Sequence, residues 1–538
     1  MANDITTDVV IVGSGVSGAL VAAELAKAGI KVTILEAGDE VDRSTAVDTY
    51  WNNPIKTPES AYPLDENVLH PVVADIGAYY QQQGPDSFGS SYIKVVGGTT
   101  WHWLGTSLRF VPKDFLLKTT YGMGEDWPFT YDDLAPFYDR AEAELGVSGD
   151  AKADLGAPRT GDYPMPAIVQ TYLDKAFVKA LEGSAYRVAA TPQARNSVGG
   201  DRPACCGNNS CIPICPIQAK YDATVHLAIA TGAGAEIVPR TIATAIEVDE
   251  TGKVSGIKFT QWDGTTGTAT GKLYLVAAHA IESPRLLLNS VSDRTPHGVA
   301  NSSDQVGRNL MDHPTQLSWA QSNEPLFPYR GPLSTSGIEN LRDGEFRKDR
   351  GAFRIEIGND GWSWPTGAPI STASELALKG MRGDELNKAL YDQTARQIRL
   401  ASLVEQLPSP ENRVTLDPAK KDKFGVPLPR INYTVDDYVR KGMAEAVKAH
   451  TEIFNMLGVS AVYHFDGSQG AGHIIGTLRM GTDAKTSVVN GDLRSHDHEN
   501  LFIAGSSTFP TSATANPTLT IAALSLRLAE TMKAAMKG

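Results

Sequence analysis

A glycine-rich segment near the start of the chain constrains the fold more than any other feature of the sequence. Residues 8–12 are a short apolar run, residues 13–18 (GSGVSG) follow, and residues 19–28 are rich in helix formers. A second apolar run, residues 31–35, ends at Glu36. This order of strand, tight turn, helix and strand predicts a parallel α/β domain of the Rossmann type that binds a dinucleotide.

Each glycine of this motif has a physical role. Gly13 permits the tight turn, Gly15 lets the backbone approach a pyrophosphate, and Gly18 allows the helix to pack closely on the strand. The positive end of the helix dipole then faces the phosphate charge. Glu36 is predicted to bind the ribose hydroxyls, and the place of the motif at the beginning of a long chain favours FAD over NAD.

Size and charge narrow the class of protein. A chain of 538 residues is too long for one small core, so we expect two interleaved domains. No apolar run reaches the roughly 18 residues that a membrane span needs, and the net charge of −13 argues against nucleic acid as a ligand. Residues 1–7 are polar and lack the features of a secretory signal, so the chain taken alone is expected in the cytoplasm.

A second glycine-containing segment is suited to backbone that runs along a flat ligand. Residues 95–103 (VVGGTTWHW) place Gly97, Gly98 and Thr99 beside the bulky aromatic side chains that flank His102. Flavin is the candidate ligand, which agrees with the preference for FAD at the N-terminal motif.

Several motifs along the chain resemble one known family. They are residues 306–314 (VGRNLMDHP), 473–481 (HIIGTLRMG), 500–507 (NLFIAGSS) and 516–520 (NPTLT). Together with the N-terminal fingerprint, they resemble the glucose-methanol-choline family of flavin oxidoreductases along essentially the whole chain. The resemblance implies a Rossmann-type FAD-binding domain interleaved with a substrate-binding domain built on an antiparallel sheet. It also implies an FAD-dependent dehydrogenase that acts on CH–OH groups.

The resemblance places catalysis at His473 and Asn516. Oxidising an alcohol needs removal of its hydroxyl proton as hydride leaves the carbon, and an imidazole that titrates near neutrality is a suitable base. Asn516 would hydrogen-bond the developing alkoxide. Gly505, Ser506 and Thr518, together with Asn516, are expected to contact the flavin, where a strand delivers backbone groups and the N-terminus of the following helix.

Three other histidines have different expected roles. In some members of the family a histidine shortly after a Gly-Gly pair is covalently joined to the flavin, and His102 is similar to that arrangement. His102 either carries such a bond or packs without one beside the flavin ring. For His313 and His279 we expect structural hydrogen bonding or packing near the flavin, outside the active site.

The four cysteines form one local group, Cys205, Cys206, Cys211 and Cys215, and Pro216 follows the last. A Cys-Pro ending is found in iron-sulfur ligand runs, while a four-cysteine zinc site and two local disulfides are the alternatives. The segment resembles the branch of membrane-associated bacterial sugar, polyol and sugar-acid dehydrogenases whose flavoprotein subunit carries a 3Fe-4S cluster. The resemblance implies three ligands. We expect Cys205, Cys211 and Cys215, because the adjacent Cys205 and Cys206 cannot both readily point at one small cluster.

This branch also implies partners and domain limits. A small subunit with a twin-arginine signal would export the folded chain, which has no signal of its own, to the periplasmic face of the inner membrane. A multihaem cytochrome c subunit would anchor the complex and accept electrons from the cluster. We expect the FAD-binding domain to comprise residues 1–46, 90–110, 205–315 (with the iron-sulfur loop 205–220) and 465–538, and the substrate-binding domain and lid to comprise residues 47–89, 111–204 and 316–464.

The expected substrate is a sugar, a sugar alcohol or a sugar acid, such as sorbitol, gluconate, fructose or glucose. Glucose and fructose members of the branch tend to read WHWAA where residues 101–105 here read WHWLG, and residues 216–220 read PIQAK. We therefore favour an open-chain polyol or an aldonate. An alcohol oxidase that uses oxygen is one alternative. A flavin-bearing lyase or relay subunit without redox turnover is another.

Overall fold

The N-terminal motif lies in a five-stranded parallel sheet. The computed structural model describes residues 3–54, 57, 59–62, 64–360 and 369–537. The order of strands across the sheet is β21-β12-β2-β3-β8, which is the order of a dinucleotide-binding domain, with the first strand of the sheet in the middle. These strands are β2 (Val9–Val12), β3 (Val32–Leu35), β8 (Glu236–Val238), β12 (Leu273–Val276) and β21 (Leu501–Ile503).

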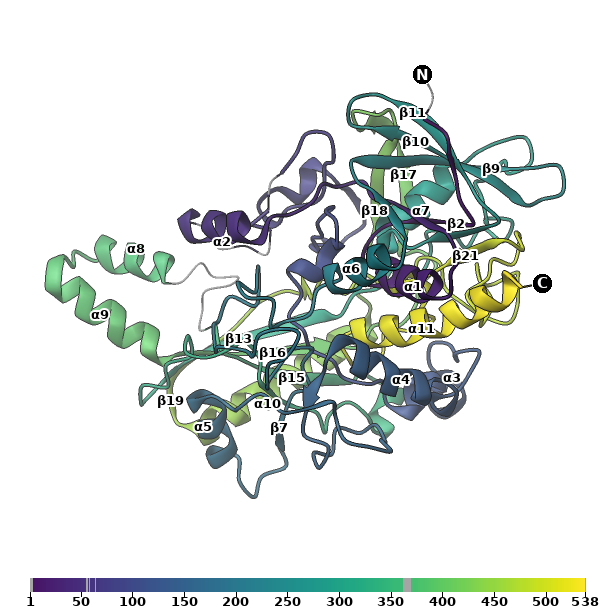
Figure 1. The fold of residues 1–538 in the computed structure, drawn as a ribbon. Coiled ribbons are helices and arrows are strands. Elements are labelled where there is room, and N and C mark those ends of the chain that lie inside the picture. Colours follow the sequence, from purple (N-terminus) through teal and green to yellow (C-terminus); the bar gives the residue numbers. More distant parts are fainter. Residues whose placement is uncertain (1–2, 55–56, 58, 63, 361–368, 538) are drawn as a thin grey trace.

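Helices cover this sheet because its strands are apolar on both faces. The sequences VVIV in β2 and LYLV in β12 are buried throughout, as expected of parallel strands between two layers. Four helices pack in a row, α6 on α1, α1 on α11 and α11 on α4 (Figure 1). Their bounds are α1 (Val16–Lys27), α4 (Tyr131–Leu145), α6 (Thr224–Gly232) and α11 (Thr518–Ala535).

The second large element is an antiparallel sheet in the order β19-β13-β16-β15-β14-β7, with β20 beside β13. One face of this sheet packs against α10 (Asp437–Leu457), where the His450 imidazole lies between the hydroxyls of Ser318 and Ser402. Since side chains alternate between faces, Thr315, Leu317 and their neighbours point the other way. The strands are β7 (Val188–Ala190), β13 (Pro314–Ser322), β14 (Ser336–Ile338), β15 (Phe353–Gly358), β16 (Gln397–Val404), β19 (Val459–His464) and β20 (Gln469–Gly470).

Smaller elements complete the molecule. Helices α8 (Ile370–Leu378) and α9 (Gly383–Arg396) extend away from the body, on the same side as α2 (Arg43–Asn52) (Figure 1). The other strands are β1 (Ile5–Thr6), β4 (Gln81–Gln83), β5 (Ser148–Gly149), β6 (Met165–Pro166), β9 (Thr241–Val248), β10 (Val254–Gln261), β11 (Thr266–Thr270), β17 (Arg413–Lys421) and β18 (Pro427–Asn432). The other α-helices are α3 (Leu117–Tyr121), α5 (Tyr172–Ala180) and α7 (His279–Asn289).

The predicted fold class is confirmed: an α/β domain of the Rossmann type is interleaved with a domain built on an antiparallel sheet. Both sheets receive strands from distant parts of the chain, so neither domain is a continuous segment. Among the described residues, we find no helix with the length and apolar character to cross a membrane.

Candidate active site

The glycine turn after β2 is fixed by close backbone packing. Gly13 has a φ of +97°, and a Cβ there would lie 2.7 Å from the carbonyl oxygen of Ala277 at the end of β12. A Cβ on Gly18 would lie 2.0 Å from the carbonyl oxygen of Gly13, so only glycine lets α1 approach the strand. A Cβ on Gly15 would meet no protein atom within 4 Å. Gly15 therefore leaves its backbone open to a ligand.

Glu36 binds the same turn at the end of β3. Its carboxylate accepts hydrogen bonds from the backbone N–H (2.9 Å) and the hydroxyl (2.6 Å) of Ser14, and from the N–H of Gly38 (2.9 Å). Burial raises the pKa of Glu36. The Ser14 hydroxyl also accepts from the N–H of Gly97 (3.0 Å), which links the two glycine-rich segments.

One cavity of about 410 Å³ brings most of the predicted residues together. Gly97 and Gly18 are not among the residues that line it, since they pack behind Ser14 and β2. The predicted residues that line the cavity are Gly13, Gly15, Glu36, Gly98, Thr99, His102, His473, Gly505, Ser506, Asn516 and Thr518.

The cavity fits a flat, phosphate-bearing cofactor. A Cβ on Gly98 would lie 3.2 Å from the Cα of Gly15, so the two glycine segments face each other with backbone alone between them. Helices α1 and α11 begin at the cavity without a side-chain cap, and their free N–H groups suit anionic oxygens. Among the described residues, the buried Nε2 of His102 has no hydrogen-bond partner, so this atom is available to a ligand.

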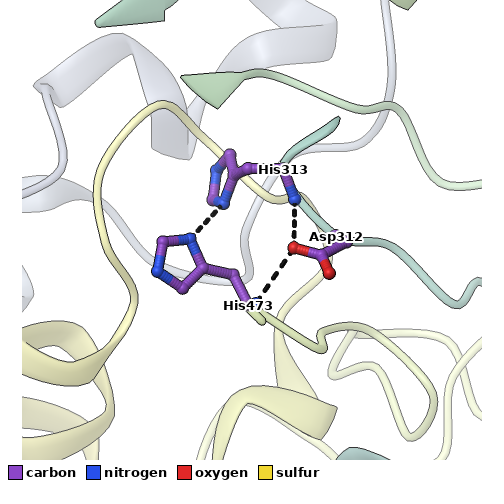
Figure 2. A group of neighbouring side chains, drawn as sticks. All are labelled: Asp312, His313 and His473. Carbon is purple, nitrogen blue, oxygen red and sulfur yellow. Dashed lines mark hydrogen bonds between the residues drawn. The ribbon is translucent and has the colours of Figure 1, made fainter. Parts of the chain in front are cut away.

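His473 and Asn516 lie next to each other in this cavity. A second histidine, His313, orients His473 (Figure 2). The Nε2 of His313 donates to the carbonyl oxygen of Ala513 (3.0 Å), and because His313 is neutral its Nδ1 must then be an acceptor. The Nδ1 of His473 donates to it (2.9 Å). The lone pair of His473 is consequently on Nε2, 3.2 Å from the Nδ2 of Asn516.

Arg354 fixes the amide of Asn516 in the same way. A guanidinium can only donate, and one of its nitrogens lies 3.3 Å from the Oδ1 of Asn516. The Nδ2 of Asn516 must therefore point at His473. Arg354 is fully buried and is itself held by the carboxylates of Glu339 (2.9 Å) and Glu356 (3.3 Å).

The electrostatics keep both histidines neutral. Burial, with His313 and Arg354 close by, holds the pKa of His473 well below its usual range. Burial likewise lowers the pKa of His313 to about 4. His473 is accordingly a proton acceptor at neutral pH.

The acid next to His313 has a structural role. The carboxylate of Asp312 accepts from the backbone N–H groups of His313 (2.6 Å), His473 (2.9 Å) and Ala471 (3.1 Å), and from the hydroxyl of Ser90. The side chains of Asp312, His313 and His473 are close enough together to offer ligands to a metal ion. The direct hydrogen bond between the two imidazoles occupies that space, however, so Asp312 joins two loops and we assign no metal there (Figure 2).

The structure adds residues that the sequence did not single out. We expected His313 outside the active site, but it contacts His473 directly. Arg354 and Glu356 are charged side chains in the otherwise apolar strand FRIEIG, and this is a signal that could have identified them. Arg399 lines the cavity as well and forms a bidentate ion pair with Asp360 (both bonds 3.0 Å).

The cysteine loop lies behind the cavity. Cys211 and Cys215 are buried, Cys205 is half-buried and Cys206 is exposed, and no disulfide joins any of the four in this structure. Ile212, the neighbour of Cys211, lines the cavity.

Lys220 connects the cysteine loop to the His102 segment. Its backbone N–H donates to the Sγ of Cys215 (3.5 Å), and its Nζ donates to the carbonyl oxygens of Trp101 (2.8 Å) and Trp103 (2.5 Å) on either side of His102. One buried residue thus bonds the cysteine loop through its backbone and the predicted flavin site through its ammonium group.

The fold and the cavity define a class, the FAD-dependent oxidoreductases that act on CH–OH donors. Family models for GMC oxidoreductases match residues 91–315 and 408–525, and a model for FAD dependent oxidoreductases matches residues 8–60. The chain belongs to the GMC oxidoreductase family, as its motifs predicted.

Individual relatives agree with this assignment. The chain is 39% identical to the fructose dehydrogenase large subunit of Gluconobacter japonicus, over 98% of each chain. It is 26% identical to the gluconate 2-dehydrogenase flavoprotein of Pantoea cypripedii, over 96% of this chain and 92% of the relative. The structure of pyridoxine 4-oxidase from Mesorbium loti shares the fold, with a TM-score of 0.68 at 17% identity over 98% of this chain and 99% of that one.

Proposed function

We propose that the protein oxidises a hydroxyl group of a sugar, sugar alcohol or sugar acid, and that electrons pass from FAD through a 3Fe-4S cluster to a cytochrome c subunit. The observation that carries the proposal is the His473–Asn516 pair: the Nε2 lone pair of His473 faces the Nδ2 of Asn516 (3.2 Å), and both residues line the cavity. Bound FAD supplies the hydride acceptor, and the protein supplies the base and the orientation.

Each residue of the pair has one task. The Nε2 of His473 accepts the proton of the substrate hydroxyl, because its other nitrogen is already used as a donor to His313. The Nδ2 of Asn516 carries two hydrogens, and it donates to the substrate oxygen as negative charge develops there. Arg354 keeps that amide in the required orientation.

The cofactor would be held by the residues that line the cavity. Gly13, Gly15 and the N-terminus of α1 would bind the pyrophosphate, and Glu36 would bind the ribose. The segment of Gly97, Gly98 and Thr99 would lie along the flavin through Gly98 and Thr99, which line the cavity, with Gly505, Ser506 and Thr518 contacting it from the other motif.

The test is anaerobic visible absorbance of the purified holoenzyme. Fructose, sorbitol, glucose or gluconate should bleach the flavin, and His473→Gln should slow bleaching by about 100-fold or more while FAD stays bound. Failure of every candidate to bleach the flavin would refute the dehydrogenase and favour the non-redox lyase or relay subunit. Rapid reoxidation by oxygen with peroxide formation would favour the oxidase alternative.

The cluster has its own test. We propose Cys205, Cys211 and Cys215 as its ligands, supported by the burial of the last two and by the place of Ile212 on the cavity wall. Cys215→Ser should abolish the iron content and the EPR signal of a 3Fe-4S cluster, whereas Cys206→Ser, the matched control at an exposed thiol, should retain both. Equal loss of iron in the two variants would contradict this ligand set, and zinc in place of iron would favour the zinc alternative.

We also propose that the Nε2 of His102 is the site of a covalent bond to FAD. The support is its burial in the cavity without a partner among the described residues. After acid precipitation, yellow colour should remain with the protein, and His102→Ala should release the flavin into the supernatant. Release of all flavin from the unaltered protein would leave His102 as a packing neighbour.

Finally, we propose the partners and location that this branch implies. The fructose dehydrogenase relative is named as a large subunit, which supports a complex with a small subunit that carries a twin-arginine signal and with a multihaem cytochrome c. The complex would lie at the periplasmic face of the inner membrane. Purification from native membranes should yield a haem-containing complex, whereas recovery of the chain alone from the cytosol would refute it.

A further inference from the structure

The part of the cavity next to His473 and Asn516 is floored by three neighbouring strands, β13, β15 and β16, through the face that does not pack on α10. Arg354 in β15 lies level with Leu403 and Thr315, and its bond to Asn516 places the reacting groups at this level. Glu356 is two residues further along β15, and two residues take up about 7 Å of a strand. Glu356 therefore lies about 7 Å along the sheet from the level of the reacting groups. A small sugar that is oxidised at one end can reach Glu356 with the hydroxyls of its other end.

The carboxylate of Glu356 has capacity left for a ligand. It accepts from the hydroxyl of Ser334 and from Arg354 (3.3 Å), and it lines the cavity. A carboxylate has about four lone-pair sites, so two remain for hydroxyl groups of a substrate. One further step along the sheet, the Asp360–Arg399 pair lines the cavity as well and presents a second carboxylate.

Each lysine or arginine that lines the described part of the cavity is already paired with a carboxylate, so none is free to bind a substrate anion. Arg399 is bound to Asp360 (2.9 Å), and Lys94 is bound to Glu282 (3.1 Å). Arg285 is bound to two carboxylates, at 3.0 and 2.6 Å. Residues 361–368, which follow Asp360, have the sequence GWSWPTGA and carry no charged side chain.

We infer that this floor recognises a neutral polyhydroxylated substrate, a sugar or a sugar alcohol, whose hydroxyls donate to Glu356 and Asp360, and that it rejects sugar acids. A carboxylate group on the substrate would enter a low-dielectric site beside Glu356 with no free cation to pair with. This inference rests on the proposed function and narrows it. The loop sequences favoured an open-chain polyol or an aldonate, and the inference keeps the polyol and leaves out the aldonate.

Binding to the reduced holoenzyme tests the inference apart from turnover. FAD-loaded protein is reduced with dithionite under anaerobic conditions, and fructose, sorbitol and gluconate are titrated by calorimetry. Fructose or sorbitol should bind at least about tenfold more tightly than gluconate. Loss of a hydrogen bond to a charged acceptor should make Glu356→Gln bind the neutral ligands about 10- to 100-fold more weakly. The preference over gluconate should also narrow in Glu356→Gln, because the repelling charge is gone.

Two further variants keep the result clear. Asp360→Asn should show the same trend if Glu356→Gln does not fold, as judged by FAD absorbance and thermal melting. Glu345→Gln, at an exposed glutamate paired with Lys348, is the matched control and should bind all three ligands as the unaltered protein does. Gluconate that binds as tightly as the neutral ligands, or an equal loss for all three in Glu356→Gln, would overturn the inference. Neutral ligands that bind but never reduce oxidised flavin would refute the proposed function instead.

Discussion

His313 should be a positioning residue for the reaction, and His313→Phe tests this without removing the ring volume. The substitution deletes the acceptor for the Nδ1–H of His473, which is 2.9 Å away. Without that acceptor, the His473 proton is free to move to Nε2, and the tautomer that can accept a proton from substrate loses its advantage.

The structure sets the expected magnitude. A buried donor left without its partner costs about 1–3 kcal/mol, which corresponds to a fall of about 5- to 150-fold in the rate of flavin reduction. KM should change little, because His313 is not among the described residues that line the cavity. His313→Gln retains a carbonyl oxygen that can accept a hydrogen bond and should recover part of the rate.

Anaerobic stopped-flow measurement of flavin bleaching gives both constants. His450→Phe is the matched control, since His450 is also buried, its pKa is also lowered, to about 3, and it bonds two serine hydroxyls on the far face of the sheet. It should lose stability without losing rate. The reasoning is refuted if His313→Phe reacts at the normal rate, if only its KM rises, or if His450→Phe is equally slow.

Other predictions concern pH, cofactor binding and stability. The base must be unprotonated to accept a proton, and the pKa of His473 is lowered. As the pH falls from about 8 to 4, kcat/KM should therefore not drop at the usual histidine pKa of about 6.5 but only in more acidic buffer. A fall of kcat/KM centred near or above about pH 6.5 would contradict a buried neutral base. Gly13→Ala should lose FAD and melt at a lower temperature, because the new Cβ meets the carbonyl oxygen of Ala277 at 2.7 Å. Gly29→Ala has a similar φ of +78° but open space, so it should keep its FAD, and equal loss in both variants would show that the contact is unimportant. Arg347→Met removes a fully buried guanidinium from two buried carboxylates and should lower the free energy of unfolding in urea by about 3–5 kcal/mol; a loss under about 1 kcal/mol would show that those carboxylates are protonated or solvated.

The sequence alone determined the fold class and the place of the cofactor motif. The information in residues 8–36 is local: glycines occupy positions that no side chain can share, such as Gly13 at positive φ and Gly18 against β2, and apolar runs mark the buried strands. The resemblance along the chain then pointed to His473 and Asn516, which the structure places side by side.

Only the tertiary structure decided how that pair is oriented and what the substrate meets. His313 and His473 are 160 residues apart, and Arg354 and Asn516 are 162 residues apart. The alternation of side chains along a strand tells which face of the sheet carries a charged residue such as Glu356. Strand pairing and loop packing decide which residues surround that side chain. Tautomer, amide orientation and local charge balance depend on those distant partners because hydrogen bonds act over about 3 Å, and no local pattern records them.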